Sequence, residues 1–174
     1  IAVDRLAAIG PVNSINDLVR GVQEANADIL ERAREQPEFR GMGTTVVMLA
    51  DIERAGSRRL GVANVGDSRL YRLTDSGLHQ HTEDHSLVEA LVRDGRLTRA
   101  EAAVHPQRNI VTRALGIDDK VLVDAWELIP VVGDRYVLCS DGLFGEIDDD
   151  EIHEVLQATS SPQDAADELV RRAR

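Results

Sequence analysis

Gly66-Asp67-Ser68-Arg69 and Ser140-Asp141-Gly142-Leu143 are two short stretches that each place an aspartate directly after an apolar run. The runs, residues 60–65 and 136–139, have the length and composition of buried β-strands. Because Mg²⁺ and Mn²⁺ take oxygen ligands, the two aspartates are candidate ligands for a divalent cation. Either stretch alone is more typical of an ordinary turn, since Gly, Asp and Ser favour turns for local hydrogen-bonding reasons.

Further motifs surround these stretches in a fixed order. They are Gly41-Met42-Gly43-Thr44-Thr45, Thr82-Glu83-Asp84-His85-Ser86-Leu87, Asp94-Gly95-Arg96-Leu97-Thr98, His105-Pro106-Gln107-Arg108-Asn109 and Thr112-Arg113-Ala114-Leu115-Gly116. In this order and at these spacings, over residues 15–171, the chain closely resembles the bacterial branch of the metal-dependent protein serine/threonine phosphatases (type 2C, or PPM). Several ordered motifs are far more specific than one short pattern. The resemblance implies an α+β fold, a four-layer αββα sandwich, and hydrolysis of phosphoserine and phosphothreonine in proteins.

The same resemblance implies a set of metal ligands. Asp141 matches the aspartate that binds the family's binuclear Mn²⁺ or Mg²⁺ centre, and Asp67 matches the aspartate of a weaker third metal. Asn109 is the nearest match to a residue that completes the third site, so the intact domain is expected to hold two or three ions. Such ions lower the pKa of a bridging water and offset the charge that develops at phosphorus, so no protein nucleophile is required.

Residues 87–111 resemble the family's flap, an insertion within a single catalytic domain over residues 1–174. Arg96, Arg108 and Arg113 are therefore candidate substrate-binding residues, with Arg99 beside them. An arginine on a helix surface commonly forms only part of a solvated face, which is the alternative for each of them. The partners implied by the resemblance are phosphorylated proteins, including serine/threonine kinases.

The chain also departs from the family pattern. It has no counterpart of the family's phosphate-binding Arg, of its Asp-Gly-x-Gly-Gly motif or of its Asp-Asn motif, and it runs from Ile1 to Arg174. It therefore resembles the middle of a phosphatase domain that is incomplete at both termini. This predicts that the segment alone is inactive, that it binds Mn²⁺ or Mg²⁺ poorly, and that it self-associates.

Composition narrows the alternatives. With 174 residues, of which 43% are apolar, the chain is long enough for one domain with a sizeable core. Its net charge of −11 argues against nucleic acid as a partner and against direct contact with an anionic membrane. The single cysteine, Cys139, excludes an internal disulfide and is expected to be buried. Without an apolar run of 18 residues, the segment is expected to be soluble and cytoplasmic.

Periodicity and capping signals predict the elements. Helices are expected over residues 14–33, 87–93 and 99–104 and after Asp148 and Ser161. Strands are expected over residues 45–50, 60–65, 70–73, 78–80, 121–128 and 136–140, with residues 51–57 and 130–134 as turns. We also expect residues 46–50, 60–65 and 136–140 to share a β core, with Asp67 and Asp141 near one another.

Other functions fit less well. His79, His81 and His85, with Glu83 or Asp84, could form a zinc site, but more simply are ordinary polar residues. A serine hydrolase using Ser140 or Ser68 lacks the Gly-x-Ser-x-Gly elbow. Two alternatives remain: a non-catalytic phosphatase-like domain that binds phosphoproteins or a partner, and a phosphatase of anti-sigma-factor-type regulators, against which the resemblance of the flap argues.

Overall fold

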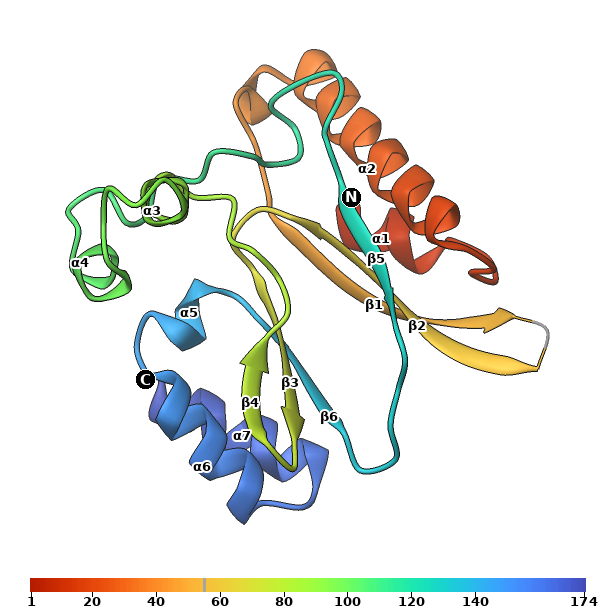
Figure 1. The fold of residues 1–174 in the computed structure, drawn as a ribbon. Coiled ribbons are helices and arrows are strands. Elements are labelled where there is room, and N and C mark those ends of the chain that lie inside the picture. Colours follow the sequence, from red (N-terminus) through yellow and green to blue (C-terminus); the bar gives the residue numbers. More distant parts are fainter. Residues whose placement is uncertain (55) are drawn as a thin grey trace. The chain divides into compact units, whose positions relative to one another are not determined.

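The computed structural model describes residues 1–54 and 56–174. The chain forms two compact units, each with its own three-stranded sheet and apolar core (Figure 1). The first unit comprises residues 1–67 and 84–130, and the second comprises residues 68–83 and 131–174.

The first unit combines the antiparallel sheet β1-β2-β5 with helices. Its elements are α1 (Ala2–Ala7), α2 (Ile15–Glu35), the 3₁₀ turn η1 (Pro37–Phe39), β1 (Val46–Arg54), β2 (Ser57–Val65), α3 (Leu87–Arg93), α4 (Arg99–Ala103) and β5 (Asp124–Leu128). In the sheet register Val46 faces Val65, and Asn64 faces Asp124. This register brings the start of β1, the end of β2 and the start of β5 to the same end of the sheet.

Helix α2 supplies one half of this unit's core. Its apolar residues recur every three or four positions, so Leu18, Val22, Ala25 and Ile29 form one buried stripe. The stripe belongs to the same apolar cluster as buried residues of β2, and burying each Leu or Val contributes roughly 1.5–3 kcal/mol. The end of β2 is therefore held firmly.

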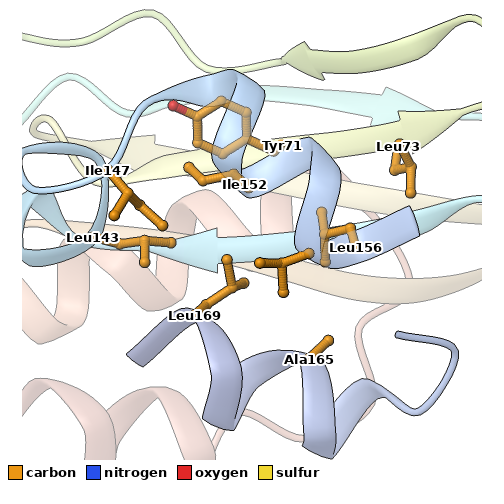
Figure 2. Packing of buried hydrophobic residues seen from close by; sticks show 9 residues of the cluster. Tyr71, Leu73, Leu143, Ile147, Ile152, Leu156, Ala165 and Leu169 are labelled. Atoms are coloured by element: carbon orange, nitrogen blue, oxygen red, sulfur yellow. The ribbon is translucent and has the colours of Figure 1, made fainter. Parts of the chain in front are cut away.

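The second unit combines the antiparallel sheet β4-β3-β6 with three helices. Its elements are β3 (Arg69–Thr74), β4 (Gly77–Gln80), β6 (Arg135–Cys139), α5 (Asp141–Phe144), α6 (Asp149–Ala158) and α7 (Pro162–Arg172). Its core joins Tyr71 and Leu73 of β3 to Ile152 and Leu156 of α6 and to Leu169 of α7 (Figure 2).

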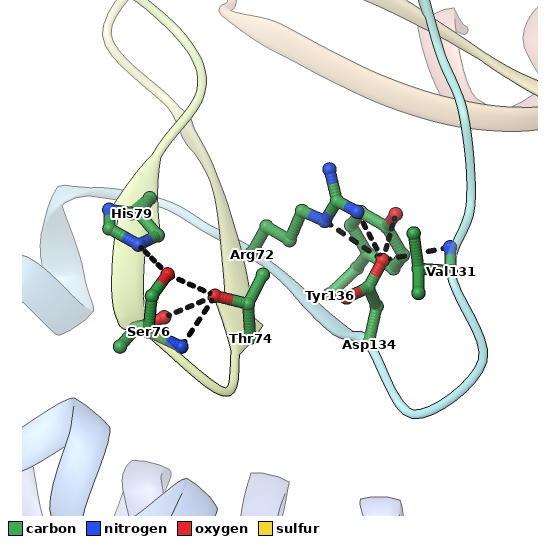
Figure 3. Close-up of polar contacts among 8 residues, drawn as sticks. Arg72, Thr74, Ser76, His79, Val131, Asp134 and Tyr136 are labelled. Carbon is green, nitrogen blue, oxygen red and sulfur yellow. Dashed lines mark hydrogen bonds and ion pairs between the residues drawn. The ribbon is translucent and has the colours of Figure 1, made fainter.

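A polar cluster in this unit ties β3 to the turn before β6 (Figure 3). The Asp134 carboxylate accepts hydrogen bonds from Arg72 Nε at 2.9 Å and from the Val131 N–H at 2.9 Å. Burial favours a raised pKa for Asp134, but the hydrogen bonds from Arg72 and Val131 outweigh it and hold this pKa below its ordinary value. Asp134 is thus a charged partner for Arg72.

Most elements that have a local signal are confirmed. Helix α3 has the predicted bounds, and Ser86, Thr98, Asp148 and Ser161 accept the expected capping hydrogen bonds. The β3-β4 hairpin is confirmed, with Gly77 at a φ of 122°. The turn over residues 130–134 is confirmed by the hydrogen bond from Asp134 N to Val131 O.

Other predictions about the elements were wrong. The expected turn over residues 51–57 is shorter, because β1 continues to Arg54 and β2 begins at Ser57; Ala55 lies outside the described residues. Residues 46–50 are half-buried rather than buried on both faces. Strand β5 begins at Asp124 instead of residue 121, and α1 was not predicted.

Three finer expectations also differ. Ser14 and Asp17 have the spacing of a capping box at the start of α2, but the Ser14 hydroxyl donates to the Asp17 carboxylate and does not accept a capping hydrogen bond. Cys139 is half-buried against the core of the second unit. Residues 46–50 and 60–65 pair in one sheet and β6 lies in the other, so a core common to all three stays a prediction.

Candidate metal centre

Asp67 follows β2 on a turn that only glycine can form. Gly66 has a φ of 109°, which L-residues rarely adopt. A Cβ at this position would lie 2.3 Å from Thr45 Cγ2 and 2.5 Å from Thr45 Cβ. The turn therefore packs directly on the Gly-Met-Gly-Thr-Thr motif, and the side chain of Asp67 is half-buried at its end.

Two hydrogen bonds between Gly66 and His85 hold this turn. The Gly66 N–H donates to His85 Nδ1 at 2.9 Å, and the His85 N–H donates to Gly66 O at 3.0 Å. Because Nδ1 accepts, the imidazole hydrogen is on Nε2, which lies 2.9 Å from Asp124 Oδ2 and donates to it. The ring is buried, with 6% of the side chain exposed. His85 thus links the Asp67 turn to the start of β5.

Asp124 is the charged end of this chain of contacts. Its other oxygen, Oδ1, accepts a hydrogen bond from Arg113 Nη1 at 2.6 Å. Burial acts to raise the pKa of the Asp124 carboxyl, but the hydrogen bonds with His85 and Arg113 outweigh it and hold this pKa below its ordinary value. A carboxylate here fixes the orientation and tautomer of the imidazole.

Asp141 is not on a simple turn, as the sequence suggested, but at the first position of the short helix α5. The Leu143 N–H donates to Ser140 O at 3.0 Å, and the Gly145 N–H donates to Asp141 O at 2.8 Å. Leu143 is buried in the core of the second unit, which anchors the helix. The Asp141 side chain is exposed at its start.

The residues predicted to form the flap make α3, α4 and the loop after them. The segment is closed at its base, where Ser86 pairs with Val111 and the Leu87 N–H donates to Ile110 O at 2.9 Å. The Arg99 guanidinium binds both oxygens of Glu89, each at 3.1 Å, and so joins the two helices. The boundaries of the flap stay a prediction.

The predicted substrate and third-metal residues lie in different environments. Arg96 follows α3, while Arg108 and Asn109 lie in the turn after α4, and all three are exposed. Arg113 is an ion-pair partner of Asp124, with 31% of its side chain exposed. The roles of all four stay predictions. Asp67 and Asn109 belong to the first unit and Asp141 to the second, and the expected proximity of the two aspartates stays a prediction as well.

The donor chemistry fits a hard cation but does not complete a cage. Asp67 and Asp141 offer carboxylate oxygens, which suit Mn²⁺ and Mg²⁺. Within residues 1–54 and 56–174, no three His, Cys, Asp or Glu side chains gather closely enough to hold a metal ion. The zinc alternative is not supported, because no such cluster includes the three histidines in this part of the chain and both ring nitrogens of His85 are engaged.

The sequence did not reveal the contact between His85 and Asp124. It identified His85 only as an ordinary polar residue or a zinc candidate, and Asp124 only as part of a strand. The available signal was a single acidic residue inside the apolar run Val121-Leu122-Val123-Asp124-Ala125. An acidic residue that interrupts an apolar strand is a candidate for a polar contact of this kind.

Known proteins similar to the chain are serine/threonine phosphatases. Serine/threonine phosphatase stp of Listeria monocytogenes is 38% identical over 156 residues, which are 90% of this chain and 60% of that protein. The PPM Ser-Thr phosphatase MsPP of Mycobacterium smegmatis, solved with cacodylate, is 37% identical with a TM-score of 0.85, over 99% of this chain and 73% of that one. The catalytic domain of PstP, solved with two manganese ions, is 34% identical with a TM-score of 0.83, over 99% and 71%. No family model matches the chain.

These likenesses extend over nearly the whole chain and agree with its mixed helices and sheets, so its fold is the α+β fold of this class of phosphatase. The chain belongs to the PPM family of bacterial serine/threonine phosphatases. It spans about 60% of the length of the first curated relatives it matches. In the described part of the chain, no helix is long and apolar enough to cross a membrane.

Proposed function

We propose that this chain is part of the catalytic domain of a metal-dependent phosphatase that removes phosphate from phosphoserine and phosphothreonine in proteins. The observation that carries the proposal is the construction of the Asp67 turn. Gly66, Thr45 and His85 fix this turn on the end of a buried strand, and all three lie in the motifs by which the sequence resembles the PPM phosphatases.

The cofactor proposed is Mn²⁺ or Mg²⁺, two or three ions in the intact domain, because the related PstP catalytic domain was solved with two manganese ions. Asp141 would bind the binuclear centre, and Asp67 and Asn109 the third ion. When bound, the ions would supply a water of lowered pKa and offset charge on the phosphoryl group. The residues of this chain contribute ligand charge and its orientation: α5 holds the Asp141 carboxylate, and His85 holds the turn that carries Asp67.

The proposed partners are phosphorylated proteins, with serine/threonine kinases among them, in the cytoplasm. Arg96, between α3 and α4, and Arg108, in the turn after α4, are both exposed and would meet a phosphorylated segment directly. Arg113 would have to leave its ion pair with Asp124, so we expect it to contribute less.

The test is a phosphatase assay of the full-length protein on a phosphothreonine peptide with Mn²⁺. We expect Asp141→Asn to lower turnover by about 10²–10³-fold, the effect of losing a preorganised charge-stabilising group. Asp67→Asn should lower turnover less, because its ion is the peripheral one. The matched control is Asp150→Asn, since Asp150 is also an exposed aspartate in the first turn of a helix, and it should leave turnover within about twofold.

A fully active Asp141→Asn variant would overturn this assignment. If the full-length protein binds the phosphopeptide without releasing phosphate, the non-catalytic alternative holds instead. We expect residues 1–174 alone to release phosphate barely above background, since they supply two of the expected carboxylates and no described cluster of three. Addition of a chelator to the active full-length protein should abolish turnover, and Mn²⁺ should restore it.

A further inference from the structure

His85 is the point at which four separate segments of the first unit meet. Its N–H and its Nδ1 bind Gly66, and its carbonyl oxygen accepts the Thr112 N–H at 2.8 Å. Its Nε2 donates to Asp124 at 2.9 Å, and the next residue, Ser86, is the N-cap of α3. One buried residue therefore connects the Asp67 turn with β5 and with both ends of the segment that carries α3 and α4.

The direction of each hydrogen bond is determined by chemistry. A backbone N–H can only donate, so Nδ1 must be the unprotonated nitrogen and Nε2 must carry the hydrogen. Arg113 Nη1 lies 2.9 Å from the same Nε2, but both atoms then carry hydrogens, so Asp124 is the acceptor for both. Asp124 thus selects the tautomer that leaves Nδ1 free to accept from Gly66.

We propose that His85 is a positioning residue for Asp67: its Nδ1 fixes the Gly66 peptide, and the peptide fixes the direction in which the Asp67 carboxylate points. Gly66 is the one residue in the turn with wide conformational freedom, at a φ of 109°. Its N–H is buried, and leaving it without an acceptor carries the full desolvation penalty of that group. Without His85 the turn would rearrange to solvate this N–H, and Asp67 would move with it.

The inference rests on the proposed function, because it takes Asp67 as a ligand for the weaker metal. Residues that orient metal ligands without touching the ion typically change metal affinity by 10–100-fold when mutated. We therefore expect loss of the Nδ1 contact to weaken Mn²⁺ binding at the Asp67 site about tenfold. The site that contains Asp141 should retain its affinity.

Two substitutions separate the two sides of the imidazole. In His85→Asn, Oδ1 is bonded to Cγ as Nδ1 is, so it can accept from Gly66 while the contact with Asp124 is lost. In His85→Gln, the longer amide reaches the position of Nε2 and can donate to Asp124, while the Gly66 N–H loses its acceptor. Each variant removes one buried contact, so a merely structural role predicts the same loss for both.

The experiment measures Mn²⁺ binding to the full-length protein by calorimetry, together with the Mn²⁺ concentration that gives half-maximal turnover. His85→Gln should weaken the lower-affinity Mn²⁺ site about tenfold, and His85→Asn should stay within about two- to threefold of wild type. Equal weakening by both variants, or none by His85→Gln, would overturn the proposal. Folding is checked by circular dichroism and the thermal midpoint.

Two further measurements keep the outcomes separate. If His85→Gln does not fold, long-range ¹H–¹⁵N NMR of the wild-type protein still determines the tautomer of the His85 imidazole. A hydrogen on Nδ1 instead of Nε2 would refute the inference. Failure of the proposed function has a different signature, which is a wild-type protein without Mn²⁺-dependent turnover. Mn²⁺ binding by calorimetry tests the role of His85 in either case.

Discussion

Replacing Gly66 with alanine tests the construction of the Asp67 turn. An alanine at a φ of 109° carries backbone strain of about 1–3 kcal/mol. Its Cβ would also lie 2.3 Å from Thr45 Cγ2 and 3.1 Å from Thr45 Cα, so the neighbouring backbone must move, which adds about 1–3 kcal/mol. We expect Gly66→Ala to lower the free energy of unfolding by about 2–6 kcal/mol in urea denaturation of the full-length protein.

The matched control is Gly77→Ala, at the β3-β4 hairpin. Gly77 has a φ of 122°, but no heavy atom lies within 4 Å of an added Cβ. This variant should show the strain alone, about 1–3 kcal/mol. If Gly66→Ala is no more destabilising than Gly77→Ala, the close packing of the turn on Thr45 is wrong.

A double-mutant cycle isolates the steric contribution to the destabilisation by Gly66→Ala. Thr45→Gly removes both Cγ2 and Cβ, the two atoms nearest to the added methyl group. Combined with Gly66→Ala, it should cost less than the sum of the two single substitutions, by about 1–3 kcal/mol. Strict additivity would refute the steric explanation, because the two side chains would then not be in contact.

Two other substitutions test buried polar contacts. Asp134→Asn should destabilise the protein by about 1.5–3 kcal/mol near neutral pH, since it removes the charge that pairs with Arg72. The folded-state pKa of Asp134 is lowered, so the stabilisation by its charge is present above the unfolded pKa of about 3.9 and is lost as the pH falls through the folded pKa. Urea midpoints of wild type and Asp134→Asn that do not converge in acid would contradict this assignment. Asn26→Leu should cost about 2–4 kcal/mol, because the Gly116 N–H and the Asp118 carbonyl oxygen lose their partners at 2.7 and 2.8 Å, and a thermal midpoint equal to that of wild type would disprove it.

Elements with a local signal could be predicted from the sequence. The capping residues Ser86 and Thr98 lie three positions before the residue whose N–H they accept, so four consecutive residues suffice to predict the start of each helix. Helix α1 has no such signal, because its N-cap is Ile1. The half-burial of β1 depends on what packs against the faces of its sheet, and no pattern within the strand contains that information.

The candidate site was predicted in outline only. Asp67 and Asp141 stand out because each follows an apolar run, and the resemblance to the phosphatases assigned them a role. The contact between His85 and Asp124 spans 39 residues of sequence and follows from the pairing of β2 with β5. The local sequence assigns each of these residues to its own turn or strand, whereas the tertiary structure brings their side chains into contact.

The closed base of the segment between Ser86 and Val111 has a consequence for protein engineering. Two backbone hydrogen bonds fasten its two ends, from the Leu87 N–H to Ile110 O and from the Thr112 N–H to His85 O, and together they form the pairing of Ser86 with Val111. The entropy of closing a loop grows only slowly with its length, by about 0.6 kcal/mol for each doubling. We therefore expect that segments of other lengths and sequences can be exchanged between these two hydrogen bonds with little effect on the stability of the sheet β1-β2-β5.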